Sequence, residues 1–189
     1  MPQAIECFLR QTYPADLLIL ADGEDVADLI PADSRIRLVG LPVAPETIGE
    51  KRNIGCSLIE SDAIVHWDDD DWYAPDRIAD QVARLLSTGK AVTGYNSLTF
   101  SDGINRWRYR ASPDRAAGTS LCYLRSWWEV HPFRHVQNGE DHWFVYQAKE
   151  SGQLATCDAD GRIIASIHSE NTDARDFTDG QWEPLGQAG

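Results

Sequence analysis

The chain has 189 residues, 42% of them hydrophobic, and a formal net charge of −13 at pH 7. This length and apolar content predict one globular domain with a buried core, and they exclude a disordered chain. The acidity argues against binding to nucleic acid or to anionic membranes, because both need a basic surface.

Alternating patterns of amphipathic helix and apolar strand mark the first half of the chain. Such alternation predicts a largely parallel sheet with helices on both faces. Thr47-Ile48-Gly49-Glu50 is a capping box, and Tyr13-Pro14 ends the first helix. The predicted helices cover residues 2–12, 24–30, 47–60 and 75–86, and the predicted strands cover 17–21, 35–39 and 63–67.

The second half is richer in strand patterns. Asp102-Gly103 separates two of them and indicates a hairpin, and one helix is expected over residues 140–150. We therefore predict a single domain over residues 1–168 and a polar tail without periodic pattern over 169–189. The predicted strands of this half are 90–95, 97–100, 106–110, 119–124, 154–157 and 162–167.

The four cysteines are scattered, with no Cys-x-x-Cys pair. This is typical of reduced, buried thiols in a cytosolic protein and argues against a zinc site. The sequence also contains no signal peptide and no apolar run of membrane-spanning length. We expect a soluble, cytoplasmic protein, and no pattern in the chain indicates its oligomeric state.

Four consecutive carboxylates, Asp68 to Asp71, follow the strand that begins at Ala63. Neighbouring carboxylates raise one another's pKa unless a cation lies among them. In extended chain Asp68 and Asp70 point the same way, while Asp69 and Asp71 point elsewhere. Because α/β sheets place ligands at the carboxyl ends of their strands, this run predicts a Mg²⁺ or Mn²⁺ site that also binds phosphates. The alternative is a solvated acidic loop.

Several short motifs follow one another in a characteristic order. In this order they resemble family-2 glycosyltransferases of the GT-A fold, over roughly residues 3–168. The resemblance implies a Rossmann-like, mixed but mostly parallel sheet with helices on both faces. The motifs are Ala21-Asp22-Gly23, Arg52-Asn53, Asp68-Asp69-Asp70-Asp71 with Pro75-Asp76-Arg77, Gly139-Glu140-Asp141 and Ile167-His168-Ser169.

Two features depart from the family pattern. Family members begin with a strand before the first helix, whereas this sequence begins inside that helix, so the chain is truncated there or its sheet is completed differently. The family's Asp-Asp-Gly-Ser turn has Ala21 in its first position here, which leaves Asp22 alone to recognise the base.

The resemblance implies metal-dependent, inverting transfer of a sugar from a nucleotide-diphosphate donor, expected to be a UDP-sugar, to an unidentified hydroxyl acceptor. Asp70 would bind Mn²⁺ or Mg²⁺ directly, Asp68 would contact the ribose or the metal, and His168 would complete the coordination. Asp69 is expected among the donor-binding residues. Without the resemblance, a lone histidine such as His168 is read as a structural or surface residue, and His66 is read as a packed strand residue.

Further roles follow from the same resemblance. Asp141 would be the general base, and Glu140 would orient it or the acceptor hydroxyls. Asp22 would accept a hydrogen bond from the uracil N–H, and Lys51 and Arg52 would offset the diphosphate charge. The residues alone also allow ordinary interpretations. Glu140 and Asp141 would be acidic residues favoured at a helix N-terminus, and Asp22 an aspartate of a turn before glycine. Lys51 and Arg52 would be basic residues that face solvent.

Three tryptophans, Trp72, Trp127 and Trp128, are candidates to flank a sugar site, although most tryptophans are packing residues. Three other functions stay open. The chain could be a metal-dependent nucleotidyltransferase, a glycoside hydrolase that pairs Asp68 or Asp70 with Asp141, or a non-catalytic domain of the same fold.

Overall fold

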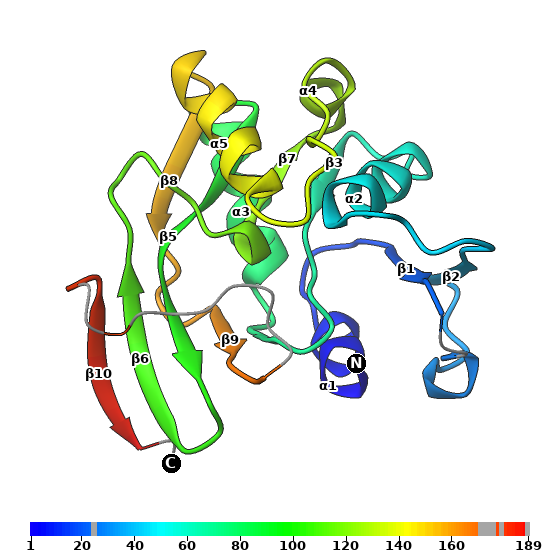
Figure 1. The fold of residues 1–189 in the computed structure, drawn as a ribbon, viewed down its shortest axis with the longest axis horizontal. Helices are drawn as coiled ribbons and strands as arrows, with labels where there is room; N and C mark the ends of the chain where they lie inside the picture. The colour runs from blue at the N-terminus through cyan, green and yellow to red at the C-terminus, as the bar shows by residue number, and fades with distance from the viewer. Residues whose placement is uncertain (24–25, 170–176, 178–179, 188–189) are drawn as a thin grey trace.

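The computed structural model describes residues 1–23, 26–169, 177 and 180–187 (Figure 1). Its helices are α1 (Pro2–Leu9), α2 (Ile48–Ser57), α3 (Arg77–Thr88), α4 (Arg125–Val130) and α5 (Glu140–Glu150), with 3₁₀ turns η1 (Ala27–Leu29) and η2 (Gly118–Ser120). Its strands are β1 (Leu17–Ala21), β2 (Ile36–Gly40), β3 (Ala63–Val65), β4 (Trp72–Tyr73), β5 (Val92–Ser101), β6 (Asn105–Arg110), β7 (Cys122–Leu124), β8 (Leu154–Asp158), β9 (Ile163–Ser166) and β10 (Trp182–Gln187).

The strands form two sheets. The small one pairs β1 and β2 in parallel, and the large one has the order β10-β6-β5-β7-β3, with β8 and β9 beside β5, and β4 beside β9. The α/β class is confirmed, but the expected predominance of parallel strands is not found in the large sheet. There, β8 and β9 run parallel to β5, whereas the pairs β10–β6, β6–β5, β5–β7, β7–β3 and β4–β9 are antiparallel. A hairpin joins β5 to β6, and such a tight turn can join only antiparallel strands.

A gap in strand pairing separates the two sheets. Within the described residues, β1 pairs with β2 alone and β3 pairs with β7 alone, so no described strand joins the two sheets. Helix α2 packs against β1 instead. At the contact, a Cβ built on Gly55 would lie 3.1 Å from Leu20 Cδ1. The sheet that the sequence predicts as one is therefore two, connected on one side by α2.

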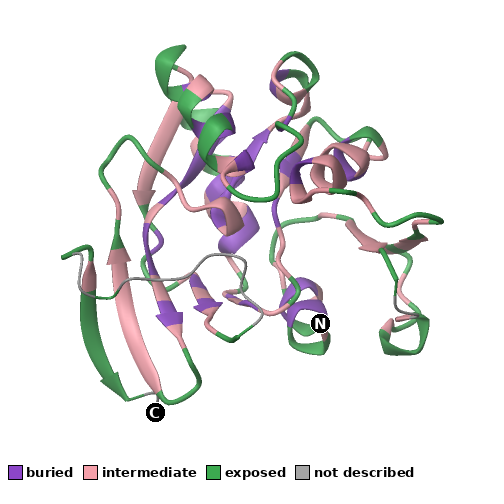
Figure 2. Cartoon of the chain, viewed as in Figure 1, coloured by how far each residue is buried: buried purple, intermediate pink, exposed green. Residues whose placement is uncertain are grey.

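Helices cover both faces of the large sheet, as expected. On β3 and β7 successive side chains point to opposite faces. Ile64 and Tyr123 face the core cluster that contains Phe144 of α5, whereas Cys122 faces the cluster that contains Val82 of α3. Figure 2 shows this buried centre between green, exposed outer surfaces. The centre of the large sheet is thus the middle layer of three.

The predicted tail contains regular structure. Residues 182–187 form β10, which pairs antiparallel with β6, and Trp182 packs against Phe100 and Tyr109 with ring centroids 5.0 Å and 4.8 Å apart. The tail needs no periodic pattern to form this strand, because the ring contacts of Trp182 and the hydrogen bonds to β6 hold it in place. Residues 182–187 therefore form a strand that no pattern in the tail indicates.

Other elements also differ from the prediction. Helix α4 and strand β4 were not expected, and the helix predicted over 24–30 is the short turn η1, with 24–25 outside the described residues. Cys7, Cys56 and Cys122 are buried free thiols, and Cys157 is a half-buried one. None of the helices in the described part of the chain combines the length and the apolar character needed to cross a bilayer.

Candidate active site

The acidic run connects β3 to β4 and turns its four side chains in different directions. Asp70 Oδ2 lies 2.7 Å from His168 Nε2, although 98 positions separate the two residues in the chain. Asp69 is exposed. Burial raises the pKa of Asp68, an effect that the charge of Arg52 opposes and that Asp70 reinforces. Asp70 and His168 are therefore in contact beyond the carboxyl end of β3, and Asp68 is near enough to Asp70 for their charges to interact.

Asp71 is a buried anchor. Its Oδ2 accepts a hydrogen bond from Thr119 Oγ1 at 2.7 Å, and its Oδ1 accepts one from the backbone N–H of Ser166 at 2.8 Å. Burial, and then the nearby charge of Asp68, raise the pKa of Asp71 to about 7. This carboxyl ties the acidic run to η2 and to β9.

Arg52 of α2 lies at the centre of a polar cluster. Its Nε is 3.0 Å from Glu140 Oε1, and its Nη1 is 2.9 Å from His66 Nδ1. Burial disfavours the charge of this guanidinium, but Asp68, Glu140 and Asp141 outweigh burial and raise its pKa. The structure thus pairs Arg52 with a carboxylate, where the sequence predicts a group free to meet a diphosphate.

His66 is a buried, neutral residue of this cluster. Burial, and then the charge of Arg52, lower the pKa of His66 well below its usual value. Its Nδ1 lies 2.9 Å from both Arg52 Nη1 and the carbonyl oxygen of Gly118, and its Nε2 lies 3.1 Å from Tyr123 Oη. A neutral imidazole can accept at Nδ1 from the arginine or donate there to the carbonyl, but not both. The sequence-based interpretation of His66 as a packed residue agrees with this burial.

Arg77 is fully buried beneath the acidic run, a role that the sequence did not indicate. It donates hydrogen bonds to the carbonyl oxygens of His66 at 2.8 Å and Thr119 at 3.1 Å. Its guanidinium also lies over the rings of Trp67 and Tyr73, 5.4 Å and 5.3 Å from their centroids. Its positive charge opposes the effect of burial on Asp68. A basic residue at a helix N-terminus, where the dipole disfavours it, was the available signal.

Asp141 lies in the first turn of α5, on the other side of η2. Its Oδ1 accepts a hydrogen bond from the backbone N–H of His142 at 2.7 Å. A Cβ built on Gly118 would lie 2.2 Å from Asp141 Oδ2, so only glycine leaves this carboxylate its present position. The turn η2 therefore lies between the acidic run, through Thr119, and Asp141, through Gly118.

Asp22 and Lys51 form an ion pair at the end of β1. Their Oδ1 and Nζ atoms are 2.7 Å apart, and more than a third of each side chain is exposed. The sequence predicts separate contacts of these residues, with a base and with a diphosphate. The structure brings them together and offsets the charge of Lys51.

The remaining predicted residues are packing residues. Asn53 donates to the carbonyl of Phe133 at 2.8 Å and accepts from the backbone N–H of Phe133 and from Trp128 Nε1. Trp127 is 8% exposed and belongs to the core. Trp72 is half-buried on β4. Burial thus leaves Trp127 little surface for a sugar, and Trp128 serves to hold Asn53.

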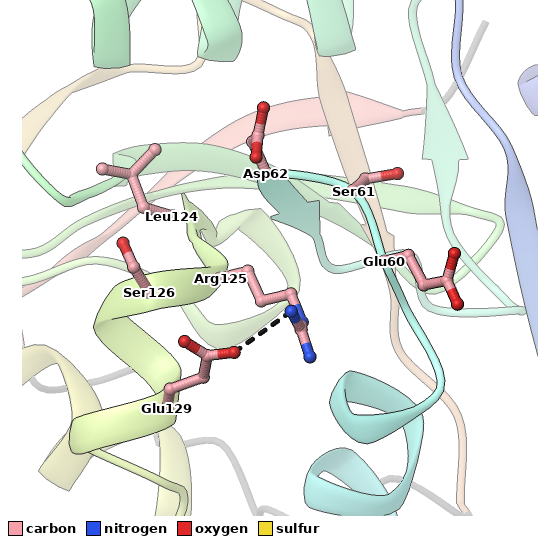
Figure 3. A pocket seen from close by; sticks show the side chains of 7 residues that line it. All are labelled: Glu60, Ser61, Asp62, Leu124, Arg125, Ser126 and Glu129. Atoms are coloured by element: carbon pink, nitrogen blue, oxygen red, sulfur yellow. Dashed lines mark ion pairs between the residues drawn. The ribbon is translucent and has the colours of Figure 1, made fainter.

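An open cavity of about 370 Å³ lies at the opposite end of β3 (Figure 3). An ion pair between Arg125 and Glu129, 3.1 Å apart, lies on its wall. None of the residues predicted to be functional lines this cavity. One of its lining residues, Asp62, comes just before β3 in the chain, whereas the acidic run comes after β3. The lining residues are Glu60, Ser61, Asp62, Leu124, Arg125, Ser126 and Glu129.

Comparison with known sequences gives one clear match. The family model described as "Glycosyl transferase family 2" matches residues 1–149. No protein in a comparison with curated sequences matches the chain.

Solved structures of similar fold include two glycosyltransferase systems. TarS residues 1–349 from S. aureus, in complex with UDP-GlcNAc, superposes with a TM-score of 0.72 at 12% identity, over 91% of this chain and 56% of that one. Mannosyltransferase PcManGT from Pyrobaculum calidifontis, in complex with GDP-Man and Mn²⁺, superposes with a TM-score of 0.67 at 11% identity, over 89% of this chain and 53% of that one. The match shows a common fold, and it spans only about half of the length of these two chains.

Proposed function

The chain belongs to glycosyl transferase family 2 and has the GT-A fold, and from this membership we propose that it transfers a sugar from a nucleotide-diphosphate donor to a hydroxyl acceptor. The proposal includes a divalent cation, Mn²⁺ or Mg²⁺, a UDP-linked donor and inversion at the anomeric carbon. The complexes of TarS with UDP-GlcNAc and of PcManGT with GDP-Man and Mn²⁺ support the donor class and the cation.

The observation that carries the proposal is the contact between Asp70 and His168. The carboxylate and the imidazole are 2.7 Å apart, and Asp68 lies within electrostatic reach of Asp70. In the described part of the chain, no group of three His, Cys, Asp or Glu side chains is arranged to hold a metal ion. This donor set fits a cation that takes one or two carboxylates from the protein and its other ligands from phosphate and water.

A bound cation would supply Lewis-acid stabilisation of the diphosphate as charge builds on it. The two basic side chains predicted to meet the diphosphate are poorly placed for that task, because Arg52 is paired with Glu140 and Lys51 with Asp22. In this proposal Asp70 and His168 would hold the cation, and Asp68 would move toward it when the donor binds.

Asp141 would accept the proton of the attacking hydroxyl at Oδ2, the oxygen that faces Gly118. Glu140 would act through Arg52, because their ion pair fixes the first turn of α5 and hence the position of Asp141. Asp22 would accept a hydrogen bond from the base of the donor with the oxygen that Lys51 leaves open. The deprotonated oxygen would bond to the anomeric carbon on the side opposite the diphosphate, whose bond to that carbon breaks, so the centre would be inverted.

Calorimetry with UDP and GDP in Mn²⁺, followed by a turnover assay over a panel of nucleotide sugars, tests the proposal. We expect Asp70→Ala to weaken diphosphate binding at least about tenfold, as for loss of a charged ligand. Asp141→Asn should bind the donor normally while turnover falls about 10²- to 10⁴-fold, the usual contribution of a general base. Asp62→Asn, an exposed carboxylate at the other end of β3, is the matched control.

Wild-type turnover in Asp141→Asn would show that Asp141 is not the general base. Sugar release that survives EDTA would remove the cation and favour a glycoside hydrolase instead.

A further inference from the structure

A second open cavity, of about 300 Å³, lies beside the outer face of α5. One wall comes from the loop between β6 and η2, and the other from side chains of α5 three or four residues apart, which therefore share one face of the helix. Val145, 4% exposed, contributes an apolar part of the lining. Residues that line the cavity include Asp114, Arg115, His142, Val145, Tyr146 and Lys149.

Asp141 does not line this cavity but precedes the lining residue His142 on α5. Asp141 lies one helical turn before Val145, and the α5 segment from 141 to 149 rises about 12 Å at 1.5 Å per residue. The opposite wall continues directly into η2, where Gly118 lies against Asp141 Oδ2. A molecule bound in the cavity thus extends along α5 toward the proposed base.

The cavity is basic, although the chain carries a net charge of −13. Exposed Arg115 has no ion pair with any residue that the structure describes. Lys149 Nζ lies 2.6 Å from Asp114 Oδ2, and the hydrogen bond from this lysine, followed by one from Ser112, lowers the pKa of Asp114 to about 2. Asp114 therefore offsets the charge of Lys149 and leaves that of Arg115 unpaired among the described residues, and a guanidinium presents a planar pair of donors that suits phosphate or carboxylate oxygens.

Exposed aromatic side chains extend the same surface. Trp143 and Tyr146 are 37% and 41% exposed, and their ring centroids lie 5.6 Å apart. The guanidinium of Arg134 lies 3.7 Å from the centroid of the Trp143 ring. Amphipathic rings held in place beside solvent provide flat surfaces against which the apolar faces of sugars pack.

We infer that this cavity binds the acceptor, and that the acceptor is a carbohydrate carrying an oxyanion, a phosphate or a carboxylate, held by Arg115 beside the Lys149–Asp114 pair. The inference rests on the proposed function, because it takes Asp141 as the base. The aromatic pair contacts the sugar next to the oxyanion, and the hydroxyl to be modified points along α5 toward Asp141. A neutral glycan leaves Arg115 without a partner and binds more weakly.

Nuclear magnetic resonance titrations of the ¹⁵N-labelled protein without donor test this inference with three probes: glycerol 1-phosphate, glucuronate and glucose. We expect one or both anions to shift the amide signals of residues 112–115 and 142–149, and glucose at the same concentration not to. Arg115→Gln should weaken the anion about tenfold, the effect of one charge-assisted hydrogen bond. Arg10→Gln removes the same charge from the exposed, distant pair on α1 and should change nothing.

Preference for glycerol 1-phosphate identifies a phosphorylated acceptor, and preference for glucuronate identifies an acidic sugar. Equal binding of anions by wild type and Arg115→Gln, or no shift with either anion, overturns the inference. Lys149→Gln is the second variant and should also weaken binding, because it leaves the Asp114 carboxylate beside the anion without its counter-charge. Nucleotide binding is measured separately. Anion binding without nucleotide binding would refute the proposed transferase activity but not the anion site.

Discussion

The Arg52–Glu140 ion pair offers the sharpest test of how the candidate site is held together. The two atoms are 3.0 Å apart, and the side chains are 21% and 6% exposed. Arg52→Ala leaves the Glu140 carboxylate buried without its counter-charge. Breaking such a buried pair from one side lowers the free energy of unfolding by about 3–5 kcal/mol. For a domain of this size each kcal/mol of lost unfolding free energy lowers the melting temperature by about 2–4 °C. We therefore expect the melting temperature of Arg52→Ala to lie about 6–20 °C below that of the wild type.

A double-mutant cycle separates the interaction between Arg52 and Glu140 from the effect of removing either side chain alone. Arg52→Ala/Glu140→Ala removes both charges, so it should lose less stability than the two single variants together. We expect a coupling free energy of about 1.5–3 kcal/mol by urea denaturation at pH 7 in EDTA. The matched control is the exposed pair Arg10–Glu6, 62% and 69% exposed, whose coupling should be about 0.3–0.5 kcal/mol. A coupling between Arg52 and Glu140 no larger than the control would refute the role assigned to this pair.

Three further predictions concern the scaffold around the site. Gly49→Ala should lower the free energy of unfolding by about 1–3 kcal/mol, because the added Cβ would lie 1.8 Å from the carbonyl oxygen of Arg134. The control is Gly40→Ala. Its added Cβ meets no atom within 4 Å and should change the free energy of unfolding by less than about 0.5 kcal/mol. Because the pKa of Asp71 is raised to about 7 in the folded protein, the fold keeps a proton that the unfolded chain loses above about pH 4, so this group's contribution to stability falls as pH rises from 4 to 7. Asp71→Asn removes that loss, and its stability relative to wild type, measured in EDTA, should improve by up to about 4 kcal/mol over this range; a difference that does not change with pH would contradict the assignment. Phe144→Ala should cost about 3–5 kcal/mol in chemical denaturation, because the ring is fully buried and stacks on that of Phe133 at 4.3 Å.

The sequence predicted the elements whose pattern is local. The apolar run over residues 17–21 located β1, and the helix expected over 140–150 is α5. The capping box located the start of α2, where Thr47 accepts a hydrogen bond from the backbone N–H of Glu50. The order of the motifs indicated the family that the match over residues 1–149 shows. Patterns of this kind depend on neighbours within a few residues, so the chain alone is enough to identify them.

Pairing between distant segments required the tertiary structure. Strand β10 exists because β6 supplies its hydrogen bonds, and the small sheet stands apart because no described strand joins it to β3. The same holds for charges. The sequence showed where Arg52 and Asp71 lie in the chain, but only the fold brings Glu140 to the first and Thr119 to the second. Burial and partner together decide whether a charged side chain is available to a substrate or neutralised inside the protein, and both depend on which remote segments come into contact.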